Sequence, residues 1–188
     1  MQGLIVLLSG PSGVGKNSII NELRQLNPEL YEYSISATTR LPRGDEKDGI
    51  NYYFISKSQF LQWINESKFI EWATYNENYY GTPLKPILDN VSKGKVTLTE
   101  IDVKGALQVM QTTLKHFSIF IMPPDRNVLL NRLKSRATDD PSSIEKRLEI
   151  AEWEMQQSIK FDKTLVNDDL IETVKAIDYL ILNRMKTE

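Results

Sequence analysis

The sequence predicts an α/β protein whose core is a parallel sheet with helices on both faces. Short apolar strands alternate with helical patterns at both ends of the chain, and its 188 residues suit one domain of ordinary size. The stretch from about residue 33 to 82 is rich in strands and lacks the long helices that parallel crossovers need. We therefore expect a small mixed or antiparallel lobe inserted there.

The core begins with the apolar run 4–8, which leads directly into a glycine-rich loop. This loop matches the P-loop pattern G-x-x-x-x-G-K completely from Gly10 to Lys16, and apolar residues at helical spacing follow it. In such a loop, main-chain N–H groups, the terminal lysine and a helix N-terminus surround a polyphosphate. The alternative is a glycine-rich turn without a ligand, but such a turn has no structural need for a lysine at position 16.

The position after the loop lysine departs from the usual pattern. Ser or Thr normally stands there and its hydroxyl contacts Mg2+, whereas this chain has Asn17, with Ser18 one place later. An amide or hydroxyl oxygen is still a suitable ligand, but its geometry differs. We expect the metal to be held largely through water.

Composition excludes several classes of function. The 23 basic and 25 acidic residues leave no positive excess for nucleic-acid binding. Cysteine is absent and His116 is the single histidine, which excludes disulfides, thiol nucleophiles and multi-histidine metal sites. The longest apolar run is too short for a bilayer, and nothing resembling a signal peptide precedes it. We expect a cytoplasmic protein without membrane contact.

The lobe is predicted from short strand patterns and turn residues. Its expected elements are a strand at 33–36, an exposed, mobile and charged loop at 38–49, a strand at 52–55, a helix capped by Ser56 and a strand at 69–73. Thr82 is predicted to cap the next helix, with Pro83 in its first position and Gly94 just beyond its end.

The rest of the chain returns to alternating strands and helices. The expected elements are a strand at 96–102 that ends in acidic residues, a helix near 106–110, a strand at 119–122, helices at 125–136 and 144–159, a strand at 163–166 and a final helix with Ile171 and Ile177 on its apolar face. The break near Thr138 predicts a short flap that closes over a ligand. We expect a core of about 1–32, 83–125 and 160–188, a lobe of about 33–82 and a lid of about 126–159.

Motifs along almost the whole chain resemble those of the guanylate kinase family of nucleoside monophosphate kinases. They are the P-loop, Ser34 to Arg40 with Pro42-Arg43, Phe69 to Trp72, Asn78 to Thr82, Glu100 to Gly105, Pro123-Pro124, Arg132, Arg136, Arg147-Leu148 and Val166 to Asp169. The resemblance implies reversible phosphoryl transfer from ATP to GMP, giving ADP and GDP, with Mg2+. One further departure is Glu100, where the family more usually has Asp.

The predicted lobe contains groups suited to a nucleoside monophosphate. Guanidinium groups match phosphate oxygens bidentately, and the resemblance implies that Arg40 and Arg43 bind the GMP phosphate together with the hydroxyls of Tyr52 and Tyr80. The alternative is that the two arginines are ordinary solvated loop charge.

Glu71 lies in an otherwise apolar strand, where a carboxylate needs a partner. Guanine offers adjacent N1–H and N2–H donors that a carboxylate can accept, whereas adenine has an acceptor at N1. The resemblance adds Ser36, Thr82 and Asp102 to the base-reading set. The alternative for Glu71 is an outward-facing residue paired with a lysine.

The ATP side is assigned from the loop and from the resemblance. The expected ATP-binding residues are Gly10, Pro11, Ser12, Gly13, Val14, Gly15, Lys16, Asn17 and Ser18, with Asn167 near adenine as in similar proteins. Glu100 and Asp102 are expected to hold Mg2+ through water together with Asn17 and Ser18. The expected catalytic residues, which neutralise the transferring phosphoryl group, are Lys16, Arg132, Arg136 and Arg147. For these arginines the alternative is a salt-bridged surface helix.

Two other functions compete with this prediction. Guanylate-kinase-like modules of scaffold proteins bind phosphorylated peptides without catalysis, but they tend to lose the P-loop, which this chain keeps. A P-loop kinase for another small phosphate acceptor leaves Glu71 and the two loop arginines unexplained. The expected partners are ATP and GMP, without nucleic acid or membrane, and the sequence does not predict the oligomeric state.

Overall fold

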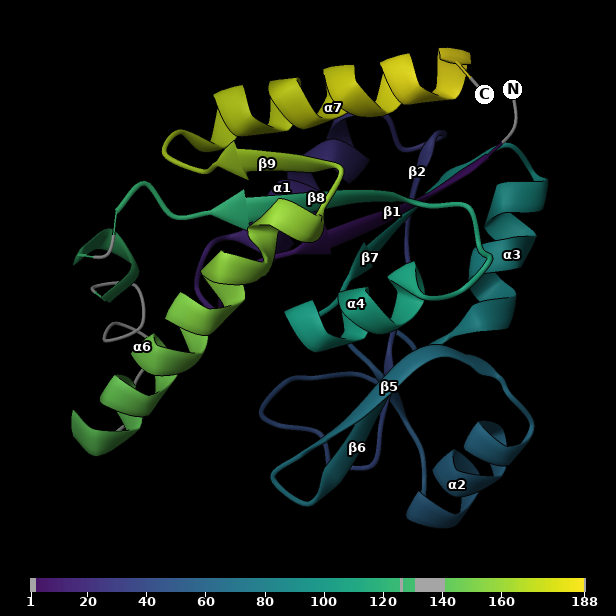
Figure 1. Ribbon diagram of the computed structural model, residues 1–188. Coiled ribbons are helices and arrows are strands. Elements are labelled where there is room, and N and C mark those ends of the chain that lie inside the picture. The colour runs from purple at the N-terminus through teal and green to yellow at the C-terminus, as the bar shows by residue number, and fades with distance from the viewer. Residues whose placement is uncertain (1–2, 126, 131–140, 188) are drawn as a thin grey trace.

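The computed structural model describes residues 3–125, 127–130 and 141–187, and it has the predicted α/β fold (Figure 1). Within these residues, five parallel strands form the core sheet in the order β2-β7-β1-β8-β9. Their bounds are β1 Leu4–Ser9, β2 Tyr31–Tyr33, β7 Val96–Glu100, β8 Phe117–Met122 and β9 Lys163–Val166.

Helices cover both faces of this sheet because its central strands are apolar on both sides. From β1, Leu4, Val6 and Leu8 pack with α1 (Lys16–Leu26) and α7 (Leu170–Thr187). The alternate residues Ile5 and Leu7 pack on the other face with α3 (Leu84–Ser92) and α4 (Val103–Met110). Figure 1 shows α7 and α4 on opposite sides of the sheet. This arrangement leaves the carboxyl ends of the strands available for a ligand.

The lobe contains a second, mixed sheet with the strand order β4-β3-β6-β5. Its strands are β3 Ala37–Thr38, β4 Tyr53–Phe54, β5 Phe69–Tyr75 and β6 Asn78–Pro83. The pairs β3·β6 and β5·β6 are antiparallel, whereas β3·β4 is parallel. The helix α2 (Lys57–Asn65) packs Phe60 against Phe69 of this sheet, and the Ser56 hydroxyl caps it by accepting from the Gln59 N–H, as predicted.

The helix α6 (Pro141–Gln156) lies within the region predicted as the lid, and the short helix η1 (Gln157–Lys160) leads into β9. Leu148 and Ala151 of α6 pack with Leu129 of the helical residues 127–130. Arg132, Arg136 and Thr138 lie outside the described residues, so their predicted roles stay predictions. No helix among the described residues combines the length and apolar character of a membrane span.

Three sequence-based boundaries are wrong. The strand expected at 33–36 is divided: Tyr33 ends β2 in the core sheet, and β3 of the lobe starts only at Ala37. Thr82 does not cap α3, because it belongs to β6 and pairs with Glu71 of β5; Pro83 takes the capping position, without a side-chain hydrogen bond. The strand expected at 96–102 ends at Glu100, since Asp102 caps α4.

Candidate active site

The P-loop joins the end of β1 to the start of α1 and borders a cavity of about 290 Å³. Gly15, the residue before the helix, has a φ of 99°, a left-handed conformation that favours glycine. A Cβ atom at Gly15 would also lie only 2.6 Å from Nδ2 of Asn167. Glycine is therefore required here both by the backbone and by the packing.

Asn167 holds the P-loop through a hydrogen bond to its main chain. It follows β9, is 5% exposed, and donates from Nδ2 to the Val14 carbonyl at 2.8 Å. This bond ties the fifth strand of the core sheet to the middle of the P-loop. The predicted contact of Asn167 with adenine stays a prediction.

Lys16 borders the same cavity, and its Nζ donates to the carbonyl oxygens of Gly10 at 2.6 Å and of Pro11 at 3.1 Å. Its charge is thus held against the loop, at the place where a polyphosphate would lie. Asn17 and Ser18 at the start of α1 also line this cavity.

Three acidic side chains also line the loop cavity. Glu100 ends β7, Asp102 caps α4, and Glu154 belongs to α6. Asp102 accepts the N–H of Gly105 at 2.7 Å, which fixes one of its carboxylate oxygens as the helix cap. Burial raises the pKa of Glu154 to about 7, although Lys16 lowers it.

A second cavity of about 250 Å³ lies between the lobe and the core. It shares five lining residues with the loop cavity, so the two are neighbours: Ser36, Tyr52, Glu100, Ile101 and Asp102. Its remaining walls come from β5 and β6 and include Glu71, Tyr75 and Tyr80. The structure thus brings together most of the residues that the sequence assigned to GMP.

The carboxylate of Glu71 is held by a chain of hydroxyl groups. Thr82 Oγ1 donates to Glu71 Oε1 at 2.6 Å, and the hydroxyls of Thr82 and Ser36 lie 3.2 Å apart. Burial raises the pKa of Glu71 to about 7, the Thr82 hydroxyl opposes that shift, and the charge of Asp102 adds to it. Glu71 therefore faces the cavity and is not an outward-facing partner of a lysine.

Gly105 makes room for this carboxylate. A Cβ atom on Gly105 would lie 2.8 Å from Glu71 Oε2 and 3.3 Å from Asp102 Oδ1. Atoms at the first distance would collide, so a side chain at position 105 would displace the carboxylate. Gly105 belongs to the family motif Glu100 to Gly105, but the motif alone does not predict this packing role.

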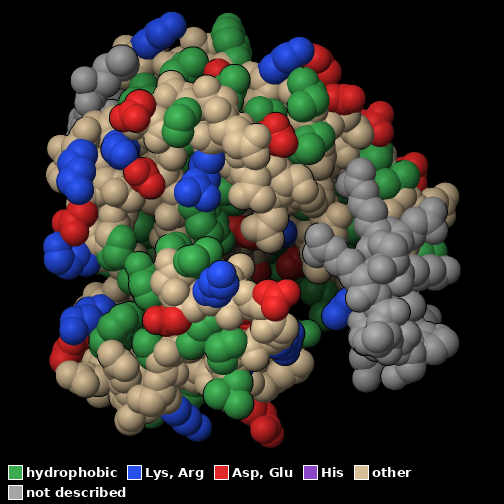
Figure 2. Space-filling model, turned by 180° about the vertical axis from the view of Figure 1, so that it is seen from behind, with side chains coloured by type: hydrophobic (Ala, Val, Ile, Leu, Met, Phe, Trp, Pro, Cys, Tyr) green, Lys and Arg blue, Asp and Glu red, His purple; other side chains and the backbone are tan. Residues whose placement is uncertain are grey.

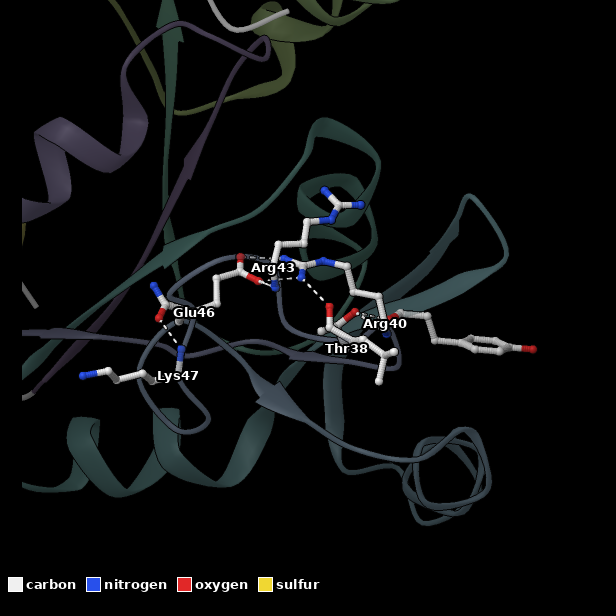
Figure 3. Close-up of polar contacts among 8 residues, drawn as sticks. Thr38, Arg40, Arg43, Glu46 and Lys47 are labelled. Carbon is white, nitrogen blue, oxygen red and sulfur yellow. Dashed lines mark hydrogen bonds and ion pairs between the residues drawn. The ribbon is translucent and has the colours of Figure 1, made fainter. Parts of the chain in front are cut away.

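Arg40 does not line the second cavity itself, but it packs on Tyr52, which does, with its Cζ 5.0 Å from the ring centroid. Its guanidinium binds Glu46 with two hydrogen bonds, of 2.6 Å and 2.7 Å. Most of the loop is exposed, as expected, but the Arg40 side chain is only 10% exposed. Figure 3 shows that the Arg43 side chain points away from the Glu46 carboxylate.

A third cavity, of about 770 Å³, opens between α6 and the lobe. Ser12 of the P-loop, Tyr75 of β5 and Arg147 of α6 all line it. Figure 2 shows a hollow in the surface with acidic side chains at its bottom. Trp153 of α6 also borders this cavity. The Nζ of Lys104 lies over its ring, 5.8 Å from the ring centroid.

Comparison with known proteins assigns the chain to a protein family. The family model described as "Guanylate kinase" matches residues 2–184. The chain belongs to the guanylate kinase family. This confirms the family resemblance seen in the sequence.

Relatives in the family cover nearly the whole chain. The guanylate kinase of Gloeobacter violaceus is 45% identical over 184 residues, which cover 98% of this chain and 89% of the relative. That of Synechocystis sp. is 45% identical over 181 residues, covering 96% of this chain and 94% of the relative. The crystal structure of guanylate kinase from Anaplasma phagocytophilum superimposes with a TM-score of 0.76 at 34% identity, covering 98% of this chain and 87% of that structure.

The site also contains residues that the sequence analysis did not assign. Glu46 lay within the loop expected at 38–49, Glu154 within the helix expected at 144–159 and Tyr75 just beyond the strand expected at 69–73, and none of them was given a role. Only Glu46 could have been found from the sequence. It lies three residues after Arg43 in a turn that contains Gly44, a spacing at which a side chain can bind the main chain of the turn.

Proposed function

We propose that the chain transfers the terminal phosphoryl group of ATP directly to the phosphate of GMP, giving ADP and GDP. One observation carries the proposal: the P-loop cavity and the lobe cavity share five lining residues, so a donor and an acceptor phosphate can meet between them. The family and its curated relatives, which are named guanylate kinases, support the same activity. No observation favours a non-catalytic phosphopeptide-binding module.

On the donor side, the N–H groups of residues 10–18 bind the polyphosphate of ATP, and Lys16 leaves its carbonyl partners to contact the terminal phosphates. This exchange requires little movement, because Lys16 already lies on the cavity wall. Arg147 of α6 lines the large cavity together with Ser12 of the P-loop, and closure of the predicted lid would bring its charge toward the transferring group.

On the acceptor side, Glu71 reads guanine by accepting its N1–H and N2–H groups, while Ser36 and Thr82 hold the carboxylate in place. Arg40, Arg43 and the hydroxyls of Tyr52 and Tyr80 bind the phosphate. The acceptor needs no general base, because the second pKa of a phosphate monoester is about 6 and GMP is largely dianionic at neutral pH. Catalysis thus consists of alignment, charge neutralisation and exclusion of water.

The oxygen donors around the loop cavity fit Mg2+. Asn17, Ser18, Glu100 and Asp102 line it together, and Mg2+ prefers oxygen ligands and keeps several waters. Among the described residues, no group of three or more His, Cys, Asp or Glu side chains is arranged to hold a metal ion. When bound with ATP, Mg2+ neutralises charge on the phosphates.

A coupled assay with ATP and Mg2+ across GMP, AMP, CMP and UMP tests the proposal. Turnover with GMP is expected to exceed turnover with the other three by orders of magnitude, because an unpaired Glu71 carboxylate penalises the wrong base. Equal rates with AMP would reject guanine recognition. GMP binding without any turnover would favour the non-catalytic module.

A further inference from the structure

Glu46 contacts both arginines of the predicted phosphate site, although neither sequence nor family assigned it a role. Its carboxylate accepts Nη1–H and Nη2–H of Arg40 at 2.6 Å and 2.7 Å (Figure 3). Oε2 also accepts the main-chain N–H of Arg43 at 2.8 Å. In return, the Glu46 N–H donates to the Arg43 carbonyl at 3.1 Å. One carboxylate therefore closes the turn and holds the first arginine.

The geometry of the ion pair leaves part of the Arg40 guanidinium available. A guanidinium has five N–H donors and two edges that can bind an anion bidentately. Glu46 occupies the end edge, formed by Nη1 and Nη2, and Nη1 also donates to the Leu41 carbonyl at 3.0 Å. Within the described residues, the side edge with Nε–H and the second Nη2–H makes no hydrogen bond.

The position of Arg40 is fixed by packing as well as by charge. Its Cζ lies 5.0 Å from the Tyr52 ring centroid and 5.7 Å from that of Phe54, and its main-chain N–H donates to Thr38 Oγ1 at 3.4 Å. Tyr52 itself lines both the lobe cavity and the loop cavity. The guanidinium is thus packed on a residue that both cavities share.

We propose that Glu46 is a positioning residue that pre-organises the phosphate-binding arginines, holding Arg40 by its end edge so that its side edge receives the acceptor phosphate. The inference rests on the proposed function. A carboxylate in this position balances the charge of Arg40 before the substrate arrives. Its two hydrogen bonds also hold the guanidinium in place, so the side chain need not be ordered at the moment of binding.

Charge is essential to this role, since a neutral amide has one acceptor oxygen for the three donors that Glu46 binds. Binding to Arg40 lowers the pKa of Glu46 to about 2, and the Arg43 N–H contributes to that shift. The carboxylate is therefore ionised at every pH at which the protein would be assayed.

The test is the variant Glu46→Gln, with Glu66→Gln as the matched control. Glu66 belongs to the same lobe, but it is paired with Lys68 on the surface and makes no hydrogen bond or ion pair with either arginine within the described residues. For Glu46→Gln, the KM for GMP is expected to rise about tenfold, while kcat and the KM for ATP stay within about twofold of wild type. Glu66→Gln is expected to leave all three unchanged.

A double-mutant cycle separates positioning from simple support of the fold. If Glu46 acts through Arg40, Glu46→Gln is expected to add little to the KM for GMP once Arg40 is changed to Lys. Glu46→Asp, which keeps the charge on a shorter side chain, is expected to recover part of the GMP affinity. This variant also serves if Glu46→Gln fails to fold.

Three results would overturn the inference. An unchanged KM for GMP in Glu46→Gln would show that the ion pair is incidental. A lower KM would show that the carboxylate competes with the phosphate for Arg40. Equal losses toward GMP and ATP, with a lower Tm, would show a purely structural role. If wild type itself fails to phosphorylate GMP, the proposed function fails instead, and the two failures are distinguishable.

Discussion

The pH dependence of GMP affinity tests the role proposed for Glu71. Burial raises the pKa of this carboxyl from the ordinary 4.5 to about 7, with a further contribution from Asp102 and an opposing one from Thr82. Only the ionised carboxylate accepts both guanine N–H groups, so GMP has to bind that form. Protonation of Glu71 below neutral pH is therefore expected to weaken GMP binding.

The size of the effect follows from the pKa. With a pKa of about 7, the ionised fraction falls from about nine tenths at pH 8 to about one tenth at pH 6. The affinity for GMP is expected to fall about tenfold over this range through Glu71 alone. A carboxyl with the ordinary pKa of 4.5 would stay ionised throughout and contribute no change.

The same shift has the opposite sign for the stability of the ligand-free protein. The folded state binds the Glu71 proton more tightly than the unfolded state does, so protonation of Glu71 stabilises the ligand-free protein. This stabilisation is complete below about pH 4.5. It is lost as the pH rises through about 7. GMP binding and ligand-free stability should therefore respond in opposite directions between these pH values.

Isothermal titration of GMP at pH 6, 7 and 8 measures the effect, with Glu71→Gln as the control. The GMP phosphate has a pKa of about 6 and contributes its own pH dependence, but the variant retains that contribution and loses only the one from Glu71. The difference between the two pH profiles isolates the carboxyl. Identical slopes for wild type and variant would refute the reasoning.

Three further variants test other parts of the site. Lys16→Ala is expected to lower kcat by more than about a hundredfold while the Kd for GMP stays within about twofold, and loss of GMP binding would show that the donor and acceptor sites are confused. Gly105→Ala is expected to raise the KM for GMP about tenfold with little change in the KM for ATP, because the new methyl group displaces the Glu71 carboxylate; equal kinetics would contradict the packing. Asn167→Ala leaves the Val14 carbonyl unpaired and is expected to lower the free energy of unfolding by about 1–3 kcal/mol, which thermal or urea unfolding measures; an unchanged Tm would show that this bond carries no stability.

The features that sequence predicted well depend on short-range patterns. The P-loop needs only a fixed spacing of glycines and a lysine between a strand and a helix, so Gly15 and Lys16 were located without knowledge of the rest of the fold. Ser56 was recognised as a helix cap for the same reason. The mixed lobe was expected because its strands are too close together for parallel crossovers.

The features that sequence missed depend on partners distant in the chain. Tyr33 pairs with Leu98 of the core sheet, and nothing in its own neighbourhood distinguishes that partner from a strand of the lobe. Thr82 looked like a cap before Pro83, but pairing with Glu71 across two strands prevailed over the local signal. Glu46 was overlooked because a glutamate in a charged loop usually faces water.

The hydrogen bond between Ser36 and Thr82 has a consequence for how acceptor choice can change. These two residues stand at the beginning and at the end of the lobe, and their hydroxyls lie 3.2 Å apart. An insertion whose two ends nearly touch places no strain on the sheet that carries it. A homologous segment with another base preference is therefore expected to be transplantable as one continuous piece, provided that it fits Asp102 and Gly105 of the core, which face the lobe cavity and Glu71.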